Sequence, residues 1–373
     1  MSESIETILE GASICACVGS GGVGKTTTSA AIAAGMAARG HKVAVLTIDP
    51  AKRLADSLGL EELGNAESQV DPALFEAAGV DPGGGELWAS MLDSKATFDE
   101  IIERHSPDPE TRDRILANRI YKQISGALAG SQEYMAMEKL YEMHERGDYD
   151  LLILDTPPSR NALDFLDAPR RLVQFVDGRS LRMFIRPAGF GARIASRGTS
   201  MIFSVLGRLT GVDLLADLSE FFTATSSLVD GFRERAERVQ GLLSAEGTEF
   251  LIVCGPAGEP IEEAAFLRGK LGELGLPLGA VIVNRVHGGD GGAPPGPEAT
   301  KALRNAGVGV GLAKRITASH ADLQALVERD AENVEKLVGR IGEAPLLRVP
   351  EMSDEVHDLA GLLSLDPYLF GEA

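Results

Sequence analysis

The nine residues from Gly19 to Thr27 read GSGGVGKTT and restrict the fold more than any other stretch of the chain. They fit the pattern GxxxxGK[ST], in which backbone N–H groups wrap the phosphates of a nucleotide. An apolar run, 14–18, precedes them, and an Ala-rich, proline-free segment of helical pattern, 26–39, follows. A strand, a glycine-rich turn and a helix place the phosphates at a helix N-terminus, where unpaired N–H donors favour anions. The pattern predicts a nucleotide-binding loop (P-loop) and an α/β fold.

Each residue of this loop has an expected role in binding. Glycines let the backbone approach phosphate oxygens without a Cβ in the way. Lys25 is expected to reach the β- and γ-phosphates, and the Thr26 hydroxyl to hold Mg²⁺. The predicted nucleotide-binding residues are Ser20, Gly21, Gly22, Val23, Gly24, Lys25, Thr26 and Thr27.

A second acidic motif lies in the middle of the chain. Four apolar residues, 151–154, end in Asp155, which is the form of a Walker B strand. At the C-terminal end of a strand, such a carboxylate lies beside the P-loop and can hold Mg²⁺. Many strands end in Asp, but after a good P-loop the motif becomes specific. Asp155 is therefore predicted to be a magnesium ligand and part of the catalytic site.

The rest of the chain predicts one P-loop domain, 1–373, around a parallel sheet flanked by helices. Further strands are expected at 42–48, 86–92, 249–254, 279–283 and 346–349, and a helical tail at 298–341. Helical patterns in 95–146, broken near its start by Pro107 and Pro109, and in 165–245 predict an inserted helical subdomain. The glycine- and proline-rich stretch 288–297 is expected to be a flexible insertion.

Composition excludes several classes of protein. The formal net charge of −19 argues against sequence-independent nucleic-acid binding, which requires cations to neutralise phosphates. There is no apolar run of ~18–20 residues to span a membrane, and the acidic N-terminal stretch does not look like a signal peptide. Three cysteines in 373 residues suit a reducing compartment. A cytoplasmic protein is expected.

Three further stretches carry a family resemblance: DPAKRLAD from Asp49, DTPPSRNAL from Asp155 and VIVNRV from Val281. Together with the P-loop they resemble the arsenite-pump (ArsA-like) ATPases, whose eukaryotic members target tail-anchored membrane proteins. The resemblance spans almost the full length. It implies the fold of the dimerising ATPases related to MinD and ParA, with an inserted helical subdomain, and ATP and Mg²⁺ as cofactors.

The resemblance also implies roles for particular residues. Asp49 matches the switch I aspartate that polarises the attacking water, and it is predicted to be catalytic and to hold the metal together with Thr26 and Asp155. An Asp-Pro pair can also simply end a strand. Asp155 matches the switch II aspartate. Asn284 matches an asparagine that contacts adenine, and Pro350 and Met352 fall in the adenine-side loop. No NKxD guanine signature occurs in the sequence, which favours ATP over GTP.

One position departs from the family pattern. The family P-loop carries a signature lysine that reaches the partner subunit's phosphates, and here that position is Ser20, which cannot supply a cation. Lys52, Arg53 and Arg160 add three cations to the switch segments, either as substitutes or as solvated surface groups. Two hypotheses follow: a homodimer that couples hydrolysis to its helical subdomain, or a slow regulatory subunit paired with a lysine-bearing paralogue.

The remaining features concern partners. The segment 170–197 holds seven arginines and one acid, Asp177, beside apolar residues. It predicts either a surface for a hydrophobic client, a partner or an anionic membrane, or a helical cap packed on the sheet. Cys15, Cys17 and Cys254 fit small core residues, so arsenite export is disfavoured and no metal beyond Mg²⁺ is expected. The acidic C-terminus disfavours membrane placement of the MinD kind.

Overall fold

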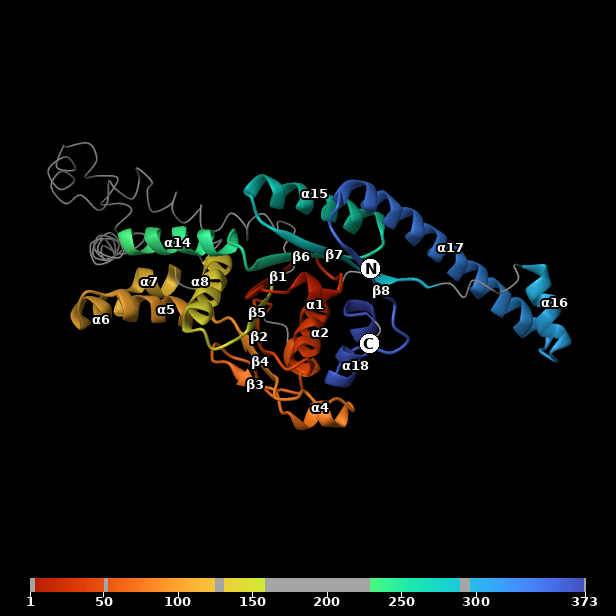
Figure 1. Cartoon of the computed structure of the whole chain (residues 1–373), viewed down its shortest axis with the longest axis horizontal. Coiled ribbons are helices and arrows are strands. Elements are labelled where there is room, and N and C mark those ends of the chain that lie inside the picture. The colour runs from red at the N-terminus through yellow and green to blue at the C-terminus, as the bar shows by residue number, and fades with distance from the viewer. Residues whose placement is uncertain (1–3, 50–52, 125–130, 158–228, 289–295, 372–373) are drawn as a thin grey trace, which may run out of the picture.

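Eight strands form one sheet, and seven of them run parallel (Figure 1). The computed structural model describes residues 4–49, 53–124, 131–157, 229–288 and 296–371. Only the two-residue strand β3 is antiparallel to its neighbour β4. The order across the sheet is β3-β4-β2-β5-β1-β6-β7-β8. The strands are β1 (Ile14–Val18), β2 (Lys42–Thr47), β3 (Ser68–Gln69), β4 (Glu86–Met91), β5 (Leu151–Asp155), β6 (Thr248–Cys254), β7 (Leu278–Val286) and β8 (Leu346–Pro350).

The residue ranges of the central strands agree closely with the sequence prediction. Their order across the sheet differs from their order along the chain. β1 and β2 are parallel, as the strand–helix–strand pattern requires, yet β5 lies between them and pairs with both. Asp155, the last residue of β5, is in register with Cys17 on one side and Thr47 on the other. This insertion brings the ends of three strands to one place at the edge of the sheet, next to the P-loop.

One face of the sheet is covered by the P-loop helix α2 (Lys25–Ala38) and short helices. Because alanines fill its length, α2 is buried on almost every side. The C-terminal segment packs on α2: Arg39, which follows α2, donates to both carboxylate oxygens of Asp366 at 2.8 Å and stacks on Phe370, 3.9 Å from the ring centroid. The helices of this layer are α1 (Ile5–Ile8), α3 (Arg53–Ser57), α4 (Ala73–Ala77), α18 (Leu359–Leu363) and α19 (Asp366–Leu369).

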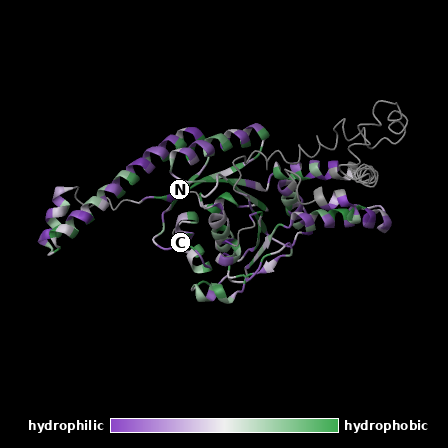
Figure 2. Cartoon of the chain, turned by 180° about the vertical axis from the view of Figure 1, so that it is seen from behind, coloured by the Kyte–Doolittle hydropathy of each residue, from purple (hydrophilic) through white to green (hydrophobic). Residues whose placement is uncertain are grey.

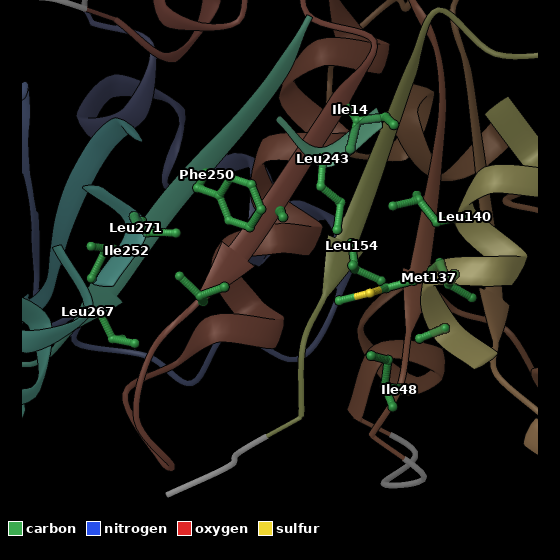
Figure 3. Packing of buried hydrophobic residues seen from close by; sticks show 14 of the residues in the cluster. Ile14, Ile48, Met137, Leu140, Leu154, Leu243, Phe250, Ile252, Leu267 and Leu271 are labelled. Carbon is green, nitrogen blue, oxygen red and sulfur yellow. The ribbon is translucent and has the colours of Figure 1, made fainter. Parts of the chain in front are cut away.

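The opposite face is covered by α8 (Ser131–Arg146), α14 (Val229–Leu243), α15 (Gly258–Leu274) and the C-terminal half of α17 (Val310–Ile341). Figure 3 shows Met137 and Leu140 of α8 beside Leu154, and Leu267 and Leu271 of α15 near Ile252. These side chains form one aliphatic cluster, as the low aromatic content of 5% requires. The residues Cys15, Cys17 and Cys254 are buried and free, which confirms their prediction as core residues.

Helices project from both ends of the sheet (Figure 1). At one end α5 (Ser94–His105), α6 (Pro109–Ala117) and α7 (Arg119–Ile124) pack beside α8 and α14. Asp93 and Asp108 cap α5 and α6, so Pro109 begins a helix where the sequence suggested only a break. The predicted segment 165–245 is described only from residue 229, and the arginine-rich part 170–197 lies outside the described residues.

At the other end, the predicted helical tail is two helices, α16 (Pro297–Asn305) and α17, joined by a turn. Gly307 has φ +86, a conformation that breaks the helix and that glycine adopts at low cost. Most of the predicted insertion, residues 289–295, lies outside the described residues. No helix in the described residues combines the length and the apolar character needed to span a bilayer.

The packing of the C-terminal segment on α2 gives a test of the core. Gly35 lies in α2, and a Cβ there would come within 2.3 Å of the Phe370 ring. A Gly→Ala change gains about 1 kcal/mol of helix propensity, but overpacking costs about 1–3 kcal/mol. We therefore expect Gly35→Ala to lower the free energy of unfolding by about 1 kcal/mol, measured by urea denaturation.

Gly269 of α15 is the matched control, because a Cβ there would meet no atom within 4 Å. Gly269→Ala should raise the free energy of unfolding by up to about 1 kcal/mol. If both substitutions raise the free energy of unfolding equally, this result would contradict the close packing of Phe370 against Gly35.

Candidate nucleotide site

The P-loop connects β1 to α2, and close packing explains two of its glycines. A Cβ on Gly19 would come within 2.0 Å of the Val253 carbonyl oxygen, and one on Gly24 within 2.3 Å of the Asn284 Nδ2. Gly24 also has φ +91 and precedes the first residue of α2 with no side-chain cap. Gly24 has no side chain that could accept hydrogen bonds from the first N–H groups of α2. These N–H groups are therefore available to an anion, as an anion site at a helix N-terminus requires.

Lys25 is the first residue of α2, and its side chain turns back over the loop. Its Nζ donates to the Ser20 carbonyl oxygen at 2.7 Å, and the side chain is only 5% exposed. Burial lowers the pKa of Lys25, while the charges of Asp155 and Asp49 act in the opposite direction. A cation is thus held inside the loop close to two carboxylates. The Ser20 hydroxyl is buried and has no hydrogen-bond partner in the described part of the chain.

Asp155 is the centre of the site and is fully buried. Its Oδ2 accepts hydrogen bonds from the hydroxyls of Thr26, at 2.8 Å, and Thr47, at 2.9 Å. Burial raises the pKa of Asp155 to about 6, although the two hydroxyls and the charge of Lys25 partly oppose the rise. Its other oxygen, Oδ1, is buried without a hydrogen-bond partner among the described residues. The carboxylate therefore retains the capacity to accept a cation or a donor.

Asp49 follows β2 at the same edge of the sheet. Its backbone N–H donates to the Thr47 hydroxyl at 3.2 Å, so Thr47 connects the two aspartates. The charge of Asp49 is one of the causes that raise the pKa of Asp155. Two carboxylates and the Thr26 hydroxyl supply the hard oxygen donors that Mg²⁺ prefers. These residues fit that ion, with the remaining positions left for water and phosphate.

The described residues contain no cluster of three or more His, Cys, Asp or Glu side chains that could form a complete protein cage for a metal. Mg²⁺ is commonly held by one or two carboxylates together with substrate phosphates. The Thr26 hydroxyl binds Asp155 directly, and Asp49 lies at the same edge of the sheet, joined to Asp155 through Thr47. Of the three switch cations, Arg53 is exposed at the start of α3, and Lys52 and Arg160 lie outside the described residues.

The predicted adenine-side residues gather at the ends of β7 and β8. Asn284 donates from Nδ2 to the Val23 carbonyl oxygen at 2.9 Å, and its Oδ1 accepts from the backbone N–H of Arg285 at 3.0 Å. Its amide therefore ties β7 to the P-loop, a role that the sequence did not indicate. Pro350 ends β8 in register with Val286, and Met352 packs at the edge of the core beside it.

Three residues near the site were not predicted. Thr47 binds Asp155, and its only sequence signal is its place two residues before Asp49. Gln132, at the start of α8, donates from Nε2 to the Ile48 carbonyl oxygen at 3.2 Å. Arg285 has φ +62, the only non-glycine positive φ in the described residues, and such strain often occurs at functional sites. Neither of the last two has a recognisable sequence pattern.

The chain is similar to known ATPases. A family model described as anion-transporting ATPase matches residues 13–290, well over half of the chain. The ATPase ASNA1 homolog of Cryptosporidium parvum is 26% identical over 269 residues, 72% of this chain and 63% of that protein, less than two thirds of its length. An arsenical pump-driving ATPase of Aquifex aeolicus is 25% identical over 364 residues, 95% of this chain and 78% of that protein. The ATPase get3 of Aspergillus terreus is 26% identical over 270 residues, 72% of this chain and 71% of that protein.

The buried carboxyl of Asp155 predicts a pH-dependent stability difference. A raised pKa means that the folded state binds the proton more tightly than the unfolded state, so ionisation of Asp155 costs stability as pH rises from about 4 to above 6. We expect Asp155→Asn, without nucleotide or Mg²⁺, to be more stable than the parent by about 1–3 kcal/mol at neutral pH. The difference should shrink to near zero below about pH 4.

The measurement is thermal or urea unfolding of both proteins across this pH range. Asp322→Asn, at an exposed position on α17, is the control and should show no comparable pH dependence. A constant difference between Asp155→Asn and the parent at every pH would contradict the buried, ionisable carboxyl described here.

Proposed function

Because the chain belongs to the anion-transporting ATPase family, we propose that it is a Mg²⁺-dependent ATPase that dimerises around ATP. The observation that supports this most directly is the cluster at the end of β5, where Asp155, Thr26, Thr47 and Asp49 meet beside Lys25. Carboxylate, hydroxyl and ammonium groups in this arrangement suit the charges of a nucleotide triphosphate and its metal. The family implies dimers, and dimerisation by this chain is part of the proposal.

In this proposal each residue acts on a particular part of the substrate. Lys25 exchanges its contact with the Ser20 carbonyl for the β- and γ-phosphates. Thr26 and Asp155, with Asp49 beside them, would hold a Mg²⁺ ion, which would neutralise charge on the phosphates. Asp49, at the end of β2, orients the attacking water and accepts its hydrogen bond. Residues at the ends of β7 and β8, including Asn284, Pro350 and Met352, line the adenine side.

Hydrolysis is proposed to change the position of the helical subdomain through α8. Gln132, at the start of α8, donates to the carbonyl of Ile48, the residue before Asp49. Further along α8, Glu138 is 1% exposed and accepts from Arg235 of α14 at 2.6 and 2.8 Å. Tyr134 also donates to Glu138. A shift at Asp49 would therefore reach two helices that are joined by a buried ion pair, and a partner or hydrophobic client would bind there.

The second candidate is a slow, regulatory subunit of a heterodimer. It is favoured by Ser20, which stands where the family has its signature lysine and whose hydroxyl carries no positive charge. A lysine-bearing paralogue would then supply the missing cation in one of the two sites. Arsenical transport is not proposed, because the three cysteines are buried in the sheet and cannot reach a metalloid. Free, reduced cysteines suit a cytoplasmic protein, and no nucleic-acid partner is proposed.

The assignment of Asp49 is tested by turnover and ATP affinity measured together. Asp49→Asn should lower the steady-state turnover by ~10²-fold or more and leave the Kd for ATP within a few-fold, because an amide orients water poorly. Lys25→Ala should instead lose tight ATP binding, since it removes the loop's cation. Asp56→Asn is the matched control, because this exposed carboxylate lies on α3 in the same switch segment.

Turnover of Asp49→Asn at the parent rate would mean that another group positions the water. Unchanged ATP affinity in Lys25→Ala would contradict the assignment of the P-loop itself.

Ser20→Lys separates the homodimer from the heterodimer. If the missing lysine limits hydrolysis, the variant should turn over ATP ~10-fold faster, with a steeper dependence on protein concentration. Arginine fingers give ~10³–10⁵-fold, but this interface is not shaped for the new lysine and misplacement is costly. Ser20→Met is the control for side-chain length without charge.

Equal rates for the parent, Ser20→Lys and Ser20→Met would remove the main support for the heterodimer. Fast turnover by the parent alone would have the same meaning, and the homodimer would then be favoured.

A further inference from the structure

A basic, apolar hairpin tip projects from the molecule at the end opposite to α5–α7 (Figures 1 and 2). It consists of residues 299–321, from α16, the turn and the first three turns of α17. Its base is fixed on the body: Asp330 of α17 accepts from the backbone and the ring of His287 at 3.0 and 2.7 Å, and Asn333 donates to the Pro256 carbonyl at 2.9 Å. The tip itself extends beyond these contacts.

The charge of the hairpin tip is opposite to that of the rest of the chain. The chain has 55 acidic residues and a net charge of −19, but residues 299–321 contain four cations and no acid. The remaining residues therefore carry −23, since −19 less +4 gives −23. All four side chains are exposed, and within the described residues none forms an ion pair; they are Lys301, Arg304, Lys314 and Arg315.

Apolar side chains lie between these cations. Residues 306–313 are only alanine, glycine, valine and leucine, and three apolar residues at and after the turn are 42–50% exposed: Val310, Leu312 and Ile316. Ala313 is buried at the contact between the two helices, and the Thr300 and Thr317 hydroxyls join them at 2.9 Å. About half of the surface of Val310, Leu312 and Ile316 therefore remains open to solvent in the described part of the chain.

We propose that the hairpin tip docks on an anionic lipid surface. Apolar residues flanked by Lys and Arg are the composition of segments that insert shallowly into a bilayer interface, where the cations meet anionic headgroups. The apolar residues are at the end of a projection and not in a groove, so they fit a deformable surface better than a rigid convex one. The acidic C-terminus argues against lipid binding by the C-terminal segment, and this argument does not apply to the hairpin tip.

The length of α17 explains how an acidic protein can approach such a surface. From Asp330, where α17 joins the body, to Val310 there are twenty residues, or roughly 30 Å at 1.5 Å per residue. This is about four Debye lengths at physiological ionic strength. The repulsion between the acidic body and anionic lipid is therefore largely screened when only the tip is in contact. The proposal does not depend on the nucleotide site.

Binding is tested by flotation of the full-length protein with two kinds of vesicle, phosphatidylcholine alone and phosphatidylcholine with about one quarter phosphatidylglycerol. We expect binding to the anionic vesicles only, weakened by salt. The double variant Lys314→Glu with Arg315→Glu should bind at least about 30-fold more weakly, because each cation near the surface contributes roughly fivefold. Leu312→Ser with Ile316→Ser should also bind more weakly.

Each tip variant has a control variant that makes the same kind of substitution outside the hairpin tip. Lys336→Glu with Arg348→Glu gives the same change in net charge at exposed positions outside the tip, and Phe266→Ser with Val338→Ser removes two exposed apolar side chains. Both should bind as the parent does. In Leu312→Trp, tryptophan fluorescence should shift to the blue with anionic vesicles, whereas Val338→Trp should not respond.

Three results would overturn the proposal: no binding to either vesicle, equal binding to neutral and anionic vesicles, or tip variants that bind as the parent does. Capture of a protein through the same residues, without vesicle binding, would assign the tip to a protein partner instead. ATP turnover of the tip variants in solution should equal that of the parent, which separates this result from failure of the proposed ATPase.

Discussion

The buried carboxylate of Asp155 is the interaction on which the site depends. A charge at this depth is costly unless it is hydrogen-bonded, and two threonine hydroxyls on two different elements provide the bonds. Thr26 belongs to α2 and Thr47 to β2, so one carboxylate fixes the P-loop helix, the second strand and β5 relative to one another. The cost is not fully offset, because burial raises the pKa of Asp155 to about 6. A bound cation would complete the compensation.

Close packing against β6 and β7 fixes the shape of the P-loop on the side away from Asp155. Gly19 lies against the Val253 carbonyl and Gly24 against Asn284, whose amide also holds the Val23 carbonyl. The P-loop is therefore held between β5 on one side and β6 and β7 on the other. These contacts come from strands far apart in the chain and hold the backbone of the loop in place, with Lys25 turned inward onto Ser20. Such preorganisation lowers the cost of ordering on binding.

The two ends of the molecule relate to the site in different ways. The helices α8 and α14 connect to it directly, through Gln132 near Asp49 and the buried pair of Glu138 and Arg235. The hairpin of α16 and α17 joins the body at its base, where His287 at the end of β7 meets Asp330 and Asn333 meets the Pro256 carbonyl. This difference supports separate roles: motion coupled to nucleotide at the first end, and attachment at the second.

The sequence by itself determined seven of the eight strands, the P-loop and the family, because these depend on local patterns: short apolar runs, glycines at fixed spacing and a carboxylate after a strand. The two-residue strand β3 was not predicted. The sequence also brought Lys25, Thr26, Asp49 and Asp155 to one site, since the C-terminal ends of parallel strands share one edge of a sheet. Only the tertiary structure decided that β5 lies between β1 and β2, because strand order depends on which helices cover which face. It alone gave Thr47, Gln132 and Asn284 their contacts. The partners of these three residues are 84 to 261 residues away along the chain, and no local pattern signals them. The turn at Gly307, which divides the tail into a projecting hairpin, likewise depends on α16 packing back on α17, a contact that helical periodicity does not encode.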